Sequence, residues 1–239
     1  MIYKLIKRLF DLILSISTLV IFIPLFFLVI LILKISDEKE VFFYQKRLGL
    51  NNKEFKMMKF ATMIKNSWDI GSKSITTRND PRVTKFGRIL RFTKINEFPQ
   101  IINVIIGDMS IVGPRPLPES SFLKYNKNVR EKIYKNKPGI TGLGSLVFRD
   151  EEKIISIVTK YDLDPMLFYK KHIYPFKGAL ELYYFHNKSF WVDFKIIFAT
   201  ALKIVFTSFK IEDIFFEKLP PKPSILNTRD LEKKLKNGK

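Results

Sequence analysis

The sequence predicts an α+β protein that is mostly helical and associated with a membrane. Three observations support this: an uncharged apolar run from Leu12 to Leu33, two short strand-like segments (VFFYQ and FKMMKF), and helical spacing of apolar residues in much of the remaining chain. The chain has 42 Lys and Arg against 23 Asp and Glu, a net charge of +19. This excess implies an anionic partner, such as a nucleic acid, an acidic membrane face or a phosphorylated substrate. The absence of cysteine excludes a disulfide scaffold and any thiolate metal site or nucleophile.

Residues 1–36 determine how the chain meets the membrane. As one straight helix, the run from Leu12 to Leu33 would be about 33 Å long and could span a bilayer. Pro24 near its centre favours a break into halves of about 18 Å, each too short to cross. The cations Lys4, Lys7 and Arg8 precede the run, so a simple span would leave the basic body outside the cytosol. We therefore expect a re-entrant helix hairpin with both ends on the cytosolic face, with a spanning signal-anchor as the alternative.

Asp11 lies just before this apolar run. A carboxylate at the membrane edge requires a partner. Lys7 and Arg8 lie within helical reach of Asp11, so we expect one of them to pair with it.

Residues 41–60 change to a strand-like pattern. The two strand-like segments flank KRLGLNNKE, in which Gly49, Asn51 and Asn52 suit a turn, so we predict a β-hairpin. Gln45, Arg47 and Lys59 on this hairpin could face a phosphate or lipid headgroup, or form a solvated basic face. A polar stretch follows at residues 64–78, where we expect a loop.

A basic helix is expected to begin at Asp80. Arg82 and Thr84 fall near its start, and the spacing places Thr84, Arg88 and Arg91 on neighbouring turns of one face. That face could bind a diphosphate through several charge-assisted hydrogen bonds. An exposed, solvated basic face is the alternative.

Residues 79–116, which include this helix, have the composition of a phosphate-handling site. Asn96 is a strong N-cap residue, and the apolar run after it stops at Gly107, which predicts a buried helix over about Glu97–Ile106. The helix N-terminus would attract an anion and keep a nearby carboxylate ionised. Asp108 follows at the far end, and Arg115 lies between two prolines that limit its freedom. A capped core helix followed by surface arginines has the same pattern.

The rest of the chain is predicted to be largely helical. A helix over residues 120–133 carries Tyr125 and Arg130, and a glycine-rich turn near Thr141 follows it. Residues 189–210 form an amphipathic helix whose Phe and Trp stripe faces either the membrane interface or the protein core. We expect four segments: the membrane hairpin at 1–36, the core at 37–146, a helical extension at 147–217 and a flexible tail at 218–239.

Several motifs occur in a fixed order: KRLFDL, FYQKRLG, FKMMKF, DPRVTKFGRILR, EFPQIINVIIGDMS, VGPRP and PGITG. In order and spacing they closely resemble the bacterial sugar transferases, which are monotopic phosphoglycosyl transferases, over roughly residues 4–145. The resemblance implies transfer of a sugar 1-phosphate from a UDP-sugar to undecaprenyl phosphate, with release of UMP, to start a surface polysaccharide or glycoconjugate. It also implies Mg²⁺, the re-entrant hairpin and contact with membrane lipids. The implied location is the cytoplasmic face of the bacterial inner membrane, with downstream glycosyltransferases as further partners.

The resemblance also assigns roles to the residues that match the family's motifs. Glu97 and Asn96 take the catalytic positions, and Glu97 and Asp108 are expected to hold the metal. Substrate binding is expected from Lys59, Asp80, Arg82, Thr84, Arg88, Arg91, Arg115, Tyr125, Arg130 and Thr141. Membrane contact is expected from Lys7, Arg8, Asp11 and Pro24.

One position departs from the family's pattern. The family typically has an adjacent Asp-Glu pair whose Asp forms a covalent phospho-sugar intermediate, whereas this sequence has Asn96 before Glu97. Because an amide is a very poor nucleophile, three possibilities arise: Glu97 attacks phosphorus or acts as a base, Asp108 takes the role, or the protein binds substrates without turnover. We favour an active enzyme that uses Glu97, with a catalytically silent substrate- or partner-binding homologue as the alternative. A nucleic-acid binder, which the charge alone would permit, lacks any recognisable motif.

Overall fold

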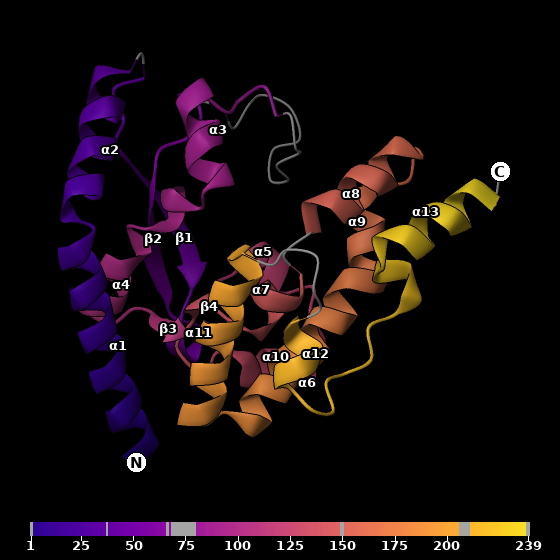
Figure 1. Cartoon of the computed structure of the whole chain (residues 1–239). Coiled ribbons are helices and arrows are strands. Elements are labelled where there is room, and N and C mark those ends of the chain that lie inside the picture. Colours follow the sequence, from indigo (N-terminus) through magenta and orange to yellow (C-terminus); the bar gives the residue numbers. More distant parts are fainter. Residues whose placement is uncertain are drawn as a thin grey trace.

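The computed structural model describes residues 2–36, 38–65, 67, 80–148, 151–205 and 211–237, and most of them are helical (Figure 1). Among these residues the strands form two small sheets of two strands each. The predicted class, a mostly helical α+β protein with a small β-hairpin, is therefore confirmed. The loop predicted at residues 64–78 lies almost entirely outside the described residues.

Two helices, α1 (Ile2–Ile21) and α2 (Ile23–Ile35), run along one edge of the molecule (Figure 1). They meet at an angle of 62°. Pro24 lies in the first turn of α2, where its missing N–H group removes a hydrogen bond to the preceding helix. The predicted break at Pro24 is thus confirmed. In the described part of the chain no single helix is long and apolar enough to cross a membrane. The two helices of this bent pair together have the length and apolar composition that a crossing needs.

The first half of α1 is bound to the protein body by its polar residues. Arg8 donates to the carbonyl oxygens of Val104 (2.6 Å) and Ile105 (2.8 Å), and the Asp11 carboxylate accepts the backbone N–H of Ile111 (3.0 Å). Lys7 pairs with Asp193 at 2.6 Å. The expected pairing of Asp11 with Lys7 or Arg8 is therefore wrong, because tertiary partners satisfy all three side chains.

The predicted β-hairpin is confirmed. Strands β1 (Phe42–Leu48) and β2 (Glu54–Phe60) pair antiparallel around the turn η1 (Leu50–Asn52), in the register Phe42 opposite Phe60. Asn51 and Asn52 take positive φ values of 55° and 60°, a conformation that Asn tolerates better than most residues. Phe42 and Phe60 stack on each other and contact Phe26 of α2, so the hairpin packs on the helix pair.

The segment that follows contains α3 (Lys85–Phe92), the 3-10 turn η3 (Ile95–Glu97), α4 (Gln100–Ile106) and β3 (Ser110–Val112). The cap of α3 is Thr84, whose hydroxyl accepts the N–H of Gly87, so the helix start predicted at Asp80 is wrong. The N-cap role predicted for Asn96 is also wrong. Lys94 adopts a left-handed conformation (φ 62°), which closes the turn η3 around Asn96 before α4 begins. The predicted helix end at Gly107 (φ 106°) is confirmed.

A second, parallel sheet joins β3 to β4 (Gly139–Thr141). Gly113 permits their close approach, because a Cβ atom there would lie 2.3 Å from the carbonyl oxygen of Lys137. Helices α1 and α4 pack against β3. The chain passes through α5 (Glu119–Phe122) and α6 (Lys127–Ile133) between the two strands and continues with α7 (Leu143–Val147) after β4. The single helix predicted over residues 120–133 is two helices, because the side chain of Asn126 caps α6 by accepting the N–H of Val129.

The C-terminal half forms the largest core. Its elements are α8 (Glu151–Lys160), α9 (Pro165–Phe168), the π-turn η4 (Tyr169–Ile173), α10 (Tyr174–Asn187), α11 (Phe190–Val205), α12 (Ile211–Phe215), η5 (Ser224–Leu226) and α13 (Thr228–Asn237). Leu226 and Leu231 are fully buried in it. The tail expected to be flexible therefore includes a packed helix, because two leucines in the charged segment reach the core.

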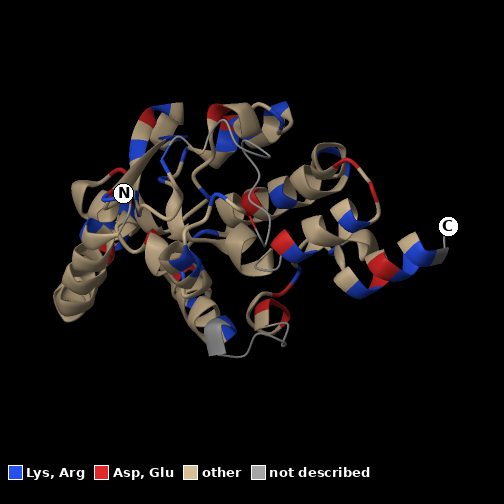
Figure 2. Ribbon diagram, turned by 90° about the horizontal axis from the view of Figure 1, so that it is seen from above, with Lys and Arg blue, Asp and Glu red and all other residues tan. Residues whose placement is uncertain are grey.

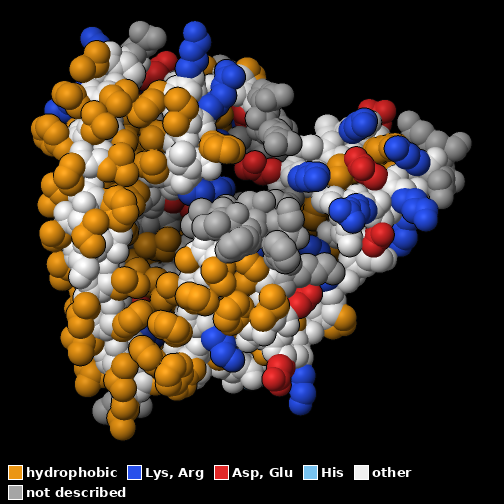
Figure 3. All heavy atoms as spheres, in the orientation of Figure 1, with side chains coloured by type: hydrophobic (Ala, Val, Ile, Leu, Met, Phe, Trp, Pro, Cys, Tyr) orange, Lys and Arg blue, Asp and Glu red, His pale blue; other side chains and the backbone are white. Residues whose placement is uncertain are grey.

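Helix α11 turns its Trp and Phe side chains outward, and its inward face combines the polar Asp193 and Lys203 with the fully buried Ile196 and Ala199. Trp191 is 71% exposed, and Phe194 and Phe198 on the same face are also exposed. On the opposite face the buried Asp193 accepts hydrogen bonds from Lys7 and from the hydroxyls of Tyr3 and Tyr184, and Lys203 pairs with Glu212 at 2.7 Å. The space-filling view shows hydrophobic side chains along α1 and α2 and over α11 (Figure 3).

Candidate active site

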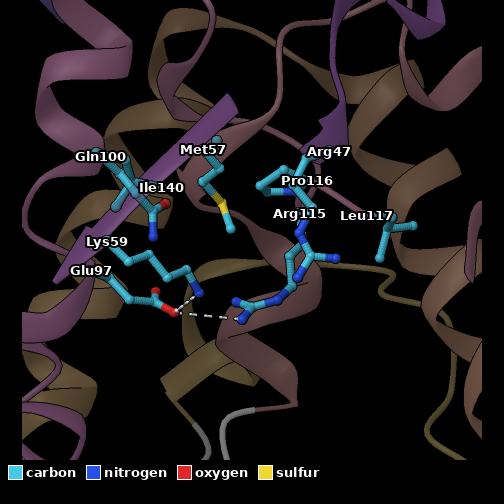
Figure 4. A pocket seen from close by; sticks show the side chains of 10 residues that line it. Arg47, Met57, Lys59, Glu97, Gln100, Arg115, Pro116, Leu117 and Ile140 are labelled. Carbon is cyan, nitrogen blue, oxygen red and sulfur yellow. Dashed lines mark hydrogen bonds and ion pairs between the residues drawn. The ribbon is translucent and has the colours of Figure 1, made fainter. Parts of the chain in front are cut away.

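A small pocket that is open to solvent lies where the hairpin, η3 and the β3–β4 region meet (Figure 4). Its charged and amide side chains come from four places: β1, β2, the turn η3 with the start of α4, and the loop after β3. The lining residues are Arg47, Met57, Lys59, Glu97, Gln100, Arg115, Pro116, Leu117, Gly139 and Ile140.

Glu97 is the carboxylate of this pocket, and two cations approach the same oxygen of it. Lys59 Nζ lies 3.0 Å from Glu97 Oε1, and Arg115 Nη2 lies 3.7 Å from that atom (Figure 4). Burial raises the pKa of Glu97, but the positive charges of Lys59 and Arg115 outweigh it and lower the value to about 2. Glu97 is therefore ionised at any physiological pH.

The pocket holds more positive than negative charge. Burial lowers the pKa of Lys59, and burial together with the nearby charge of Arg115 lowers that of Arg47 to about 10. The charge of Glu97 raises the pKa of Arg115. Three cations thus face one carboxylate, and a buried excess of this kind attracts an anion with several oxygens, such as a phosphate or diphosphate.

The local sequence holds Arg115 in place. Prolines precede and follow it, which fixes the backbone on both sides. The hydroxyl of Tyr134 donates to the carbonyl oxygen of Arg115 (2.8 Å) and accepts the N–H of Leu117 (2.8 Å). The Arg115 side chain remains 49% exposed, so its guanidinium is available to a ligand.

Asn96 adjoins Glu97 and is 9% exposed. Its Oδ1 atom is buried and accepts no hydrogen bond from any described residue. A buried acceptor atom that receives no hydrogen bond lowers the stability of the folded protein. Asn96 itself is not among the residues that line the pocket.

The structure does not bring the predicted arginine face of residues 80–91 to this pocket. Arg82 makes a bidentate pair with Asp80 (2.8 and 2.6 Å), and both side chains are buried; these hydrogen bonds lower the pKa of Asp80. Arg91 Nε donates to the hydroxyl of Thr62, Thr84 caps α3, and Arg88 is exposed. These residues shape the segment that leads into η3 but do not line the pocket.

Four other predicted site residues also lie outside the lining. Asp108 lies beyond the other end of α4, a seven-residue helix about 10 Å long, and is therefore far from Glu97. Its carboxylate lies 3.4 Å from the side-chain amide of Asn103. Tyr125 is buried against Tyr174, and the Thr141 hydroxyl bonds to that of Thr200. Arg130 on α6 has a buried Nε atom with no hydrogen-bond partner in the described residues.

Both Arg47 and Gln100 line the pocket; Arg47 was one of the hairpin residues expected to face either a phosphate or headgroup or the solvent, whereas Gln100 was not predicted. Gln100 follows Glu97 by three residues, a spacing that helical geometry could have suggested. Arg47 lies opposite Phe55 in the hairpin register. Its place in the pocket depends on how the hairpin packs on the protein, which local sequence does not reveal.

The pocket also adjoins the bend between α1 and α2. Phe98, the residue after Glu97, contacts the ring of Phe22 at the bend (5.6 Å) and that of Phe26 (5.8 Å). Residues 12–33 carry no charge, and Figure 2 shows Lys, Arg, Asp and Glu positions distributed along the rest of the ribbon. A charged pocket thus lies next to a long apolar surface.

The fold and the pocket together define a protein with one ionised carboxylate among three cations and a bent apolar helix pair. The chain belongs to the bacterial sugar transferase family, whose model matches residues 2–207.

Curated relatives agree with this membership. The chain is 36% identical over 206 residues to an undecaprenyl-phosphate glucose phosphotransferase of Komagataeibacter xylinus, covering 84% of this chain and 36% of the relative. It is 33% identical over 208 residues to the exopolysaccharide production protein ExoY of Sinorhizobium fredii, covering 81% and 83%. It is 35% identical over 209 residues to a UDP-glucose:undecaprenyl-phosphate glucose-1-phosphate transferase of Escherichia coli, covering 84% and 40%. The chain thus spans less than half of the first and third relatives and most of ExoY.

Proposed function

We propose that this protein transfers a sugar 1-phosphate from a UDP-sugar to undecaprenyl phosphate, releasing UMP and starting a surface polysaccharide. The observation that carries this proposal is the ionised Glu97 among the three cations Arg47, Lys59 and Arg115. Family membership and the names of the relatives point to the same reaction. Downstream glycosyltransferases would then extend the lipid-linked sugar.

Glu97 is the proposed nucleophile. Its carboxylate oxygen attacks the β-phosphorus of the UDP-sugar, a new O–P bond forms, and the bridging O–Pβ bond breaks so that the bridging oxygen leaves with UMP. An oxygen of undecaprenyl phosphate then attacks the same phosphorus and displaces Glu97. A carboxylate with a pKa near 2 is a poor proton acceptor at neutral pH, which disfavours a general-base role.

The cations have separate roles in this mechanism. Lys59 and Arg115 hold Glu97 ionised and oriented, and when substrate enters they can bond its phosphate oxygens and balance the developing charge. Arg47 adds a further donor, since its buried Nε atom has no hydrogen-bond partner among the described residues. Gln100 offers an uncharged amide at the same wall.

Mg²⁺ would be held jointly by the protein and the substrate. No group of three or more His, Cys, Asp and Glu side chains that could hold a metal ion occurs in the described residues. The Glu97 carboxylate and the orphaned Oδ1 of Asn96 fit an ion that also takes phosphate oxygens, the usual arrangement for Mg²⁺. When bound, the ion would neutralise charge on the diphosphate. Asp108, at the other end of α4, is not part of this proposed set.

The helix pair α1–α2 is proposed to insert into the cytoplasmic membrane from the cytosolic face as a re-entrant hairpin. Most of its exposed side chains between Leu12 and Leu33 are apolar, among them Ile13, Ile16, Val20, Phe27 and Leu31. The bend at Pro24 allows both ends to remain on one side, and the polar residues Lys7, Arg8 and Asp11 keep the start of α1 on the protein body. The contact of Phe98 with the bend would place the pocket where a lipid phosphate can reach it.

UMP release tests this proposal. The purified protein in detergent is given Mg²⁺ and a panel of UDP-sugars, with or without undecaprenyl phosphate. We expect it to release UMP over many turnovers only when the lipid is present. Glu97→Gln should reduce the rate by about a thousand-fold or more, because the nucleophile is lost. Glu131→Gln, an exposed carboxylate on α6, is the matched control and should keep the native rate.

A catalytically silent homologue is the second candidate, and Asn96 is the observation that favours it. Asn96→Asp restores the acid that is usual in the family and separates the two readings. Silence of the native protein with activity in Asn96→Asp would contradict an active enzyme and establish a substrate-binding or regulatory role. A fully active Glu97→Gln variant would contradict the nucleophile assignment.

A further inference from the structure

Helix α3 presents an outward face that mixes basic and large apolar side chains. Lys85, Arg88, Ile89 and Phe92 follow one another at the i, i+3, i+4 and i+7 spacing of a single helix face. Ile89 is 57% exposed and Phe92 is 90% exposed, and both cations are exposed as well. An aromatic residue this exposed, among other apolar side chains, is typical of an interaction surface.

The opposite face of α3 packs against the helix pair. Leu90 is buried in a cluster with Val29 and Leu33 of α2, and Phe86 packs against the same cluster. Helix α3 therefore lies beside the second arm of the hairpin, as the ribbon also shows (Figure 1). Arm α2 exposes its own apolar residues, Phe27, Leu28, Leu31 and Ile35. The face of α3 thus borders the proposed membrane surface, with Lys and Arg side chains near the end of α2 (Figure 3).

The cations on this face are not used by the pocket. Arg91 is bound to Thr62 and Thr84 caps the helix, so these members of the predicted diphosphate-binding face have partners in the protein. Arg88 points outward with Lys85 and lies outside the pocket lining. Cations that border exposed aromatic and aliphatic side chains fit an anionic lipid surface, where the apolar groups enter the acyl boundary and the cations meet phosphates.

We propose that α3 is a membrane-docking helix that seats Ile89 and Phe92 at the acyl boundary of an anionic bilayer while Lys85 and Arg88 contact lipid phosphates. This inference rests on the proposed placement of α1–α2 in the membrane. It assigns Arg88 to lipid headgroups instead of the substrate diphosphate. On the other flank, α11 contacts the first half of α1 through Phe190 and Phe10 (5.5 Å) and exposes Trp191. Docking on both flanks would fix the orientation of the pocket against the bilayer.

Fluorescence of single tryptophans tests this docking without requiring turnover. The two natural tryptophans, Trp68 and Trp191, are replaced by Phe, and Phe92→Trp is introduced into the otherwise full-length protein. In vesicles of brominated phosphatidylglycerol and phosphatidylcholine we expect its emission to shift to the blue and to be quenched. Leu31→Trp on α2 should be quenched as well, whereas Leu167→Trp on α9, an exposed leucine away from this face, should not.

The outcomes separate this inference from the proposed function. If Leu31→Trp is quenched but Phe92→Trp, like Leu167→Trp, is not, docking at α3 is overturned and the placement of the hairpin in the membrane stands. If neither Phe92→Trp nor Leu31→Trp is quenched, both the docking of α3 and the placement of α1–α2 in the membrane are overturned. UMP release reports on the transferase activity independently of these results.

Reversal of charge tests the contact with lipid phosphates. In the Phe92→Trp background, Lys85→Glu with Arg88→Glu should weaken quenching in phosphatidylglycerol vesicles and change it little in vesicles of neutral phosphatidylcholine. Lys153→Glu with Lys160→Glu on α8, both exposed, is the matched control and should leave quenching unchanged. If quenching in phosphatidylglycerol vesicles is as strong after charge reversal on α3 as before it, contact with lipid phosphates is contradicted. It is also contradicted if the control pair on α8 loses as much quenching as the pair on α3.

Discussion

Glu97 is the residue on which the charges of the pocket converge. Lys59 and Arg115 approach the same carboxylate oxygen, and Arg47 adds a third cation to the same walls. This excess of positive charge accounts both for the depressed pKa of Glu97 and for the affinity for phosphate that we propose. A single pocket thus supplies an ionised nucleophile and donors for its substrate.

Lys59→Met removes the nearer of the two cations that pair with Glu97. Because positive charge lowers the pKa of the carboxylate, we expect that pKa to rise from about 2 toward its ordinary value. The kcat/KM of the native protein should not fall through protonation of Glu97 at any pH above 5. The variant should be slower. As the pH is lowered, it should lose activity at a higher pH than the native protein does. UMP release measured from pH 4 to 8 checks this. Lys53→Met, exposed beyond the turn of the hairpin, is the control, and superimposable profiles for Lys59→Met would refute the expectation.

Glu181 on α10 is a second unusual acid, and it predicts a pH dependence of stability. It is buried, its Oε2 atom has no hydrogen-bond partner among the described residues, and burial raises its pKa to about 7. The unfolded chain binds fewer protons here than the folded one, so this group makes stability fall as pH rises from about 4.5 through 7. Glu181→Gln should therefore raise the free energy of unfolding at pH 8 by about 1–3 kcal/mol and leave it nearly unchanged at pH 4. Thermal unfolding at both pH values measures this, and an equal shift in Tm at both would contradict it.

Among the elements, those defined by strong local signals were predictable from sequence. The hairpin turn at Asn51 and Asn52, the helix end at Gly107 and the break at Pro24 all lie where residue chemistry limits the backbone. Start signals were less reliable. Asn96 has the chemistry of an N-cap, yet the left-handed Lys94 and the turn η3 give it another role.

Tertiary contacts decided what the sequence alone left open. The amphipathic pattern of α11 is the same whether its aromatic stripe faces inward or outward. The partners of Asp193 and Lys203 and the burial of Ile196 and Ala199 in the core accompany the outward arrangement. In the same way, the composition of residues 80–91 resembles a phosphate site, but Asp80 binds Arg82 within the protein. In the pocket, Glu97, Lys59 and Arg115 were predictable from motifs. For Arg47 the sequence left a phosphate and the solvent as alternatives, and the packing of the hairpin places it in the pocket lining.

Pro24→Ala tests the role of the break between α1 and α2. Alanine restores the backbone N–H and favours a continuous helix, so we expect a fraction of the protein to span the membrane with its ends on opposite faces. Because the chain has no natural cysteine, single cysteines at Lys4 and Ser36 can report the side of each end by labelling in intact and opened cells. With Pro24 both should be labelled only in opened cells. Labelling of either position in intact cells with Pro24 present would contradict the re-entrant hairpin.

Across the whole molecule, the apolar surfaces and the charged pocket are neighbours. Helices α1 and α2 expose apolar side chains, α3 and α11 extend that surface on its two flanks, and Phe98 links the bend of the hairpin to Glu97. The C-terminal half supplies the largest core and anchors α1 through Asp193. This arrangement would bring a lipid phosphate and a soluble nucleotide sugar to the same carboxylate.

The most direct test of Glu97 as the nucleophile is mass spectrometry of the native protein mixed with UDP-sugars and Mg²⁺ in the absence of lipid. We expect one sugar-phosphate adduct per protein on the peptide that contains Glu97, UMP in matching amount, and loss of the adduct when undecaprenyl phosphate is added. Glu97→Gln should form no adduct. Steady turnover in the presence of lipid, with no adduct at any time without it, would contradict a covalent intermediate on Glu97.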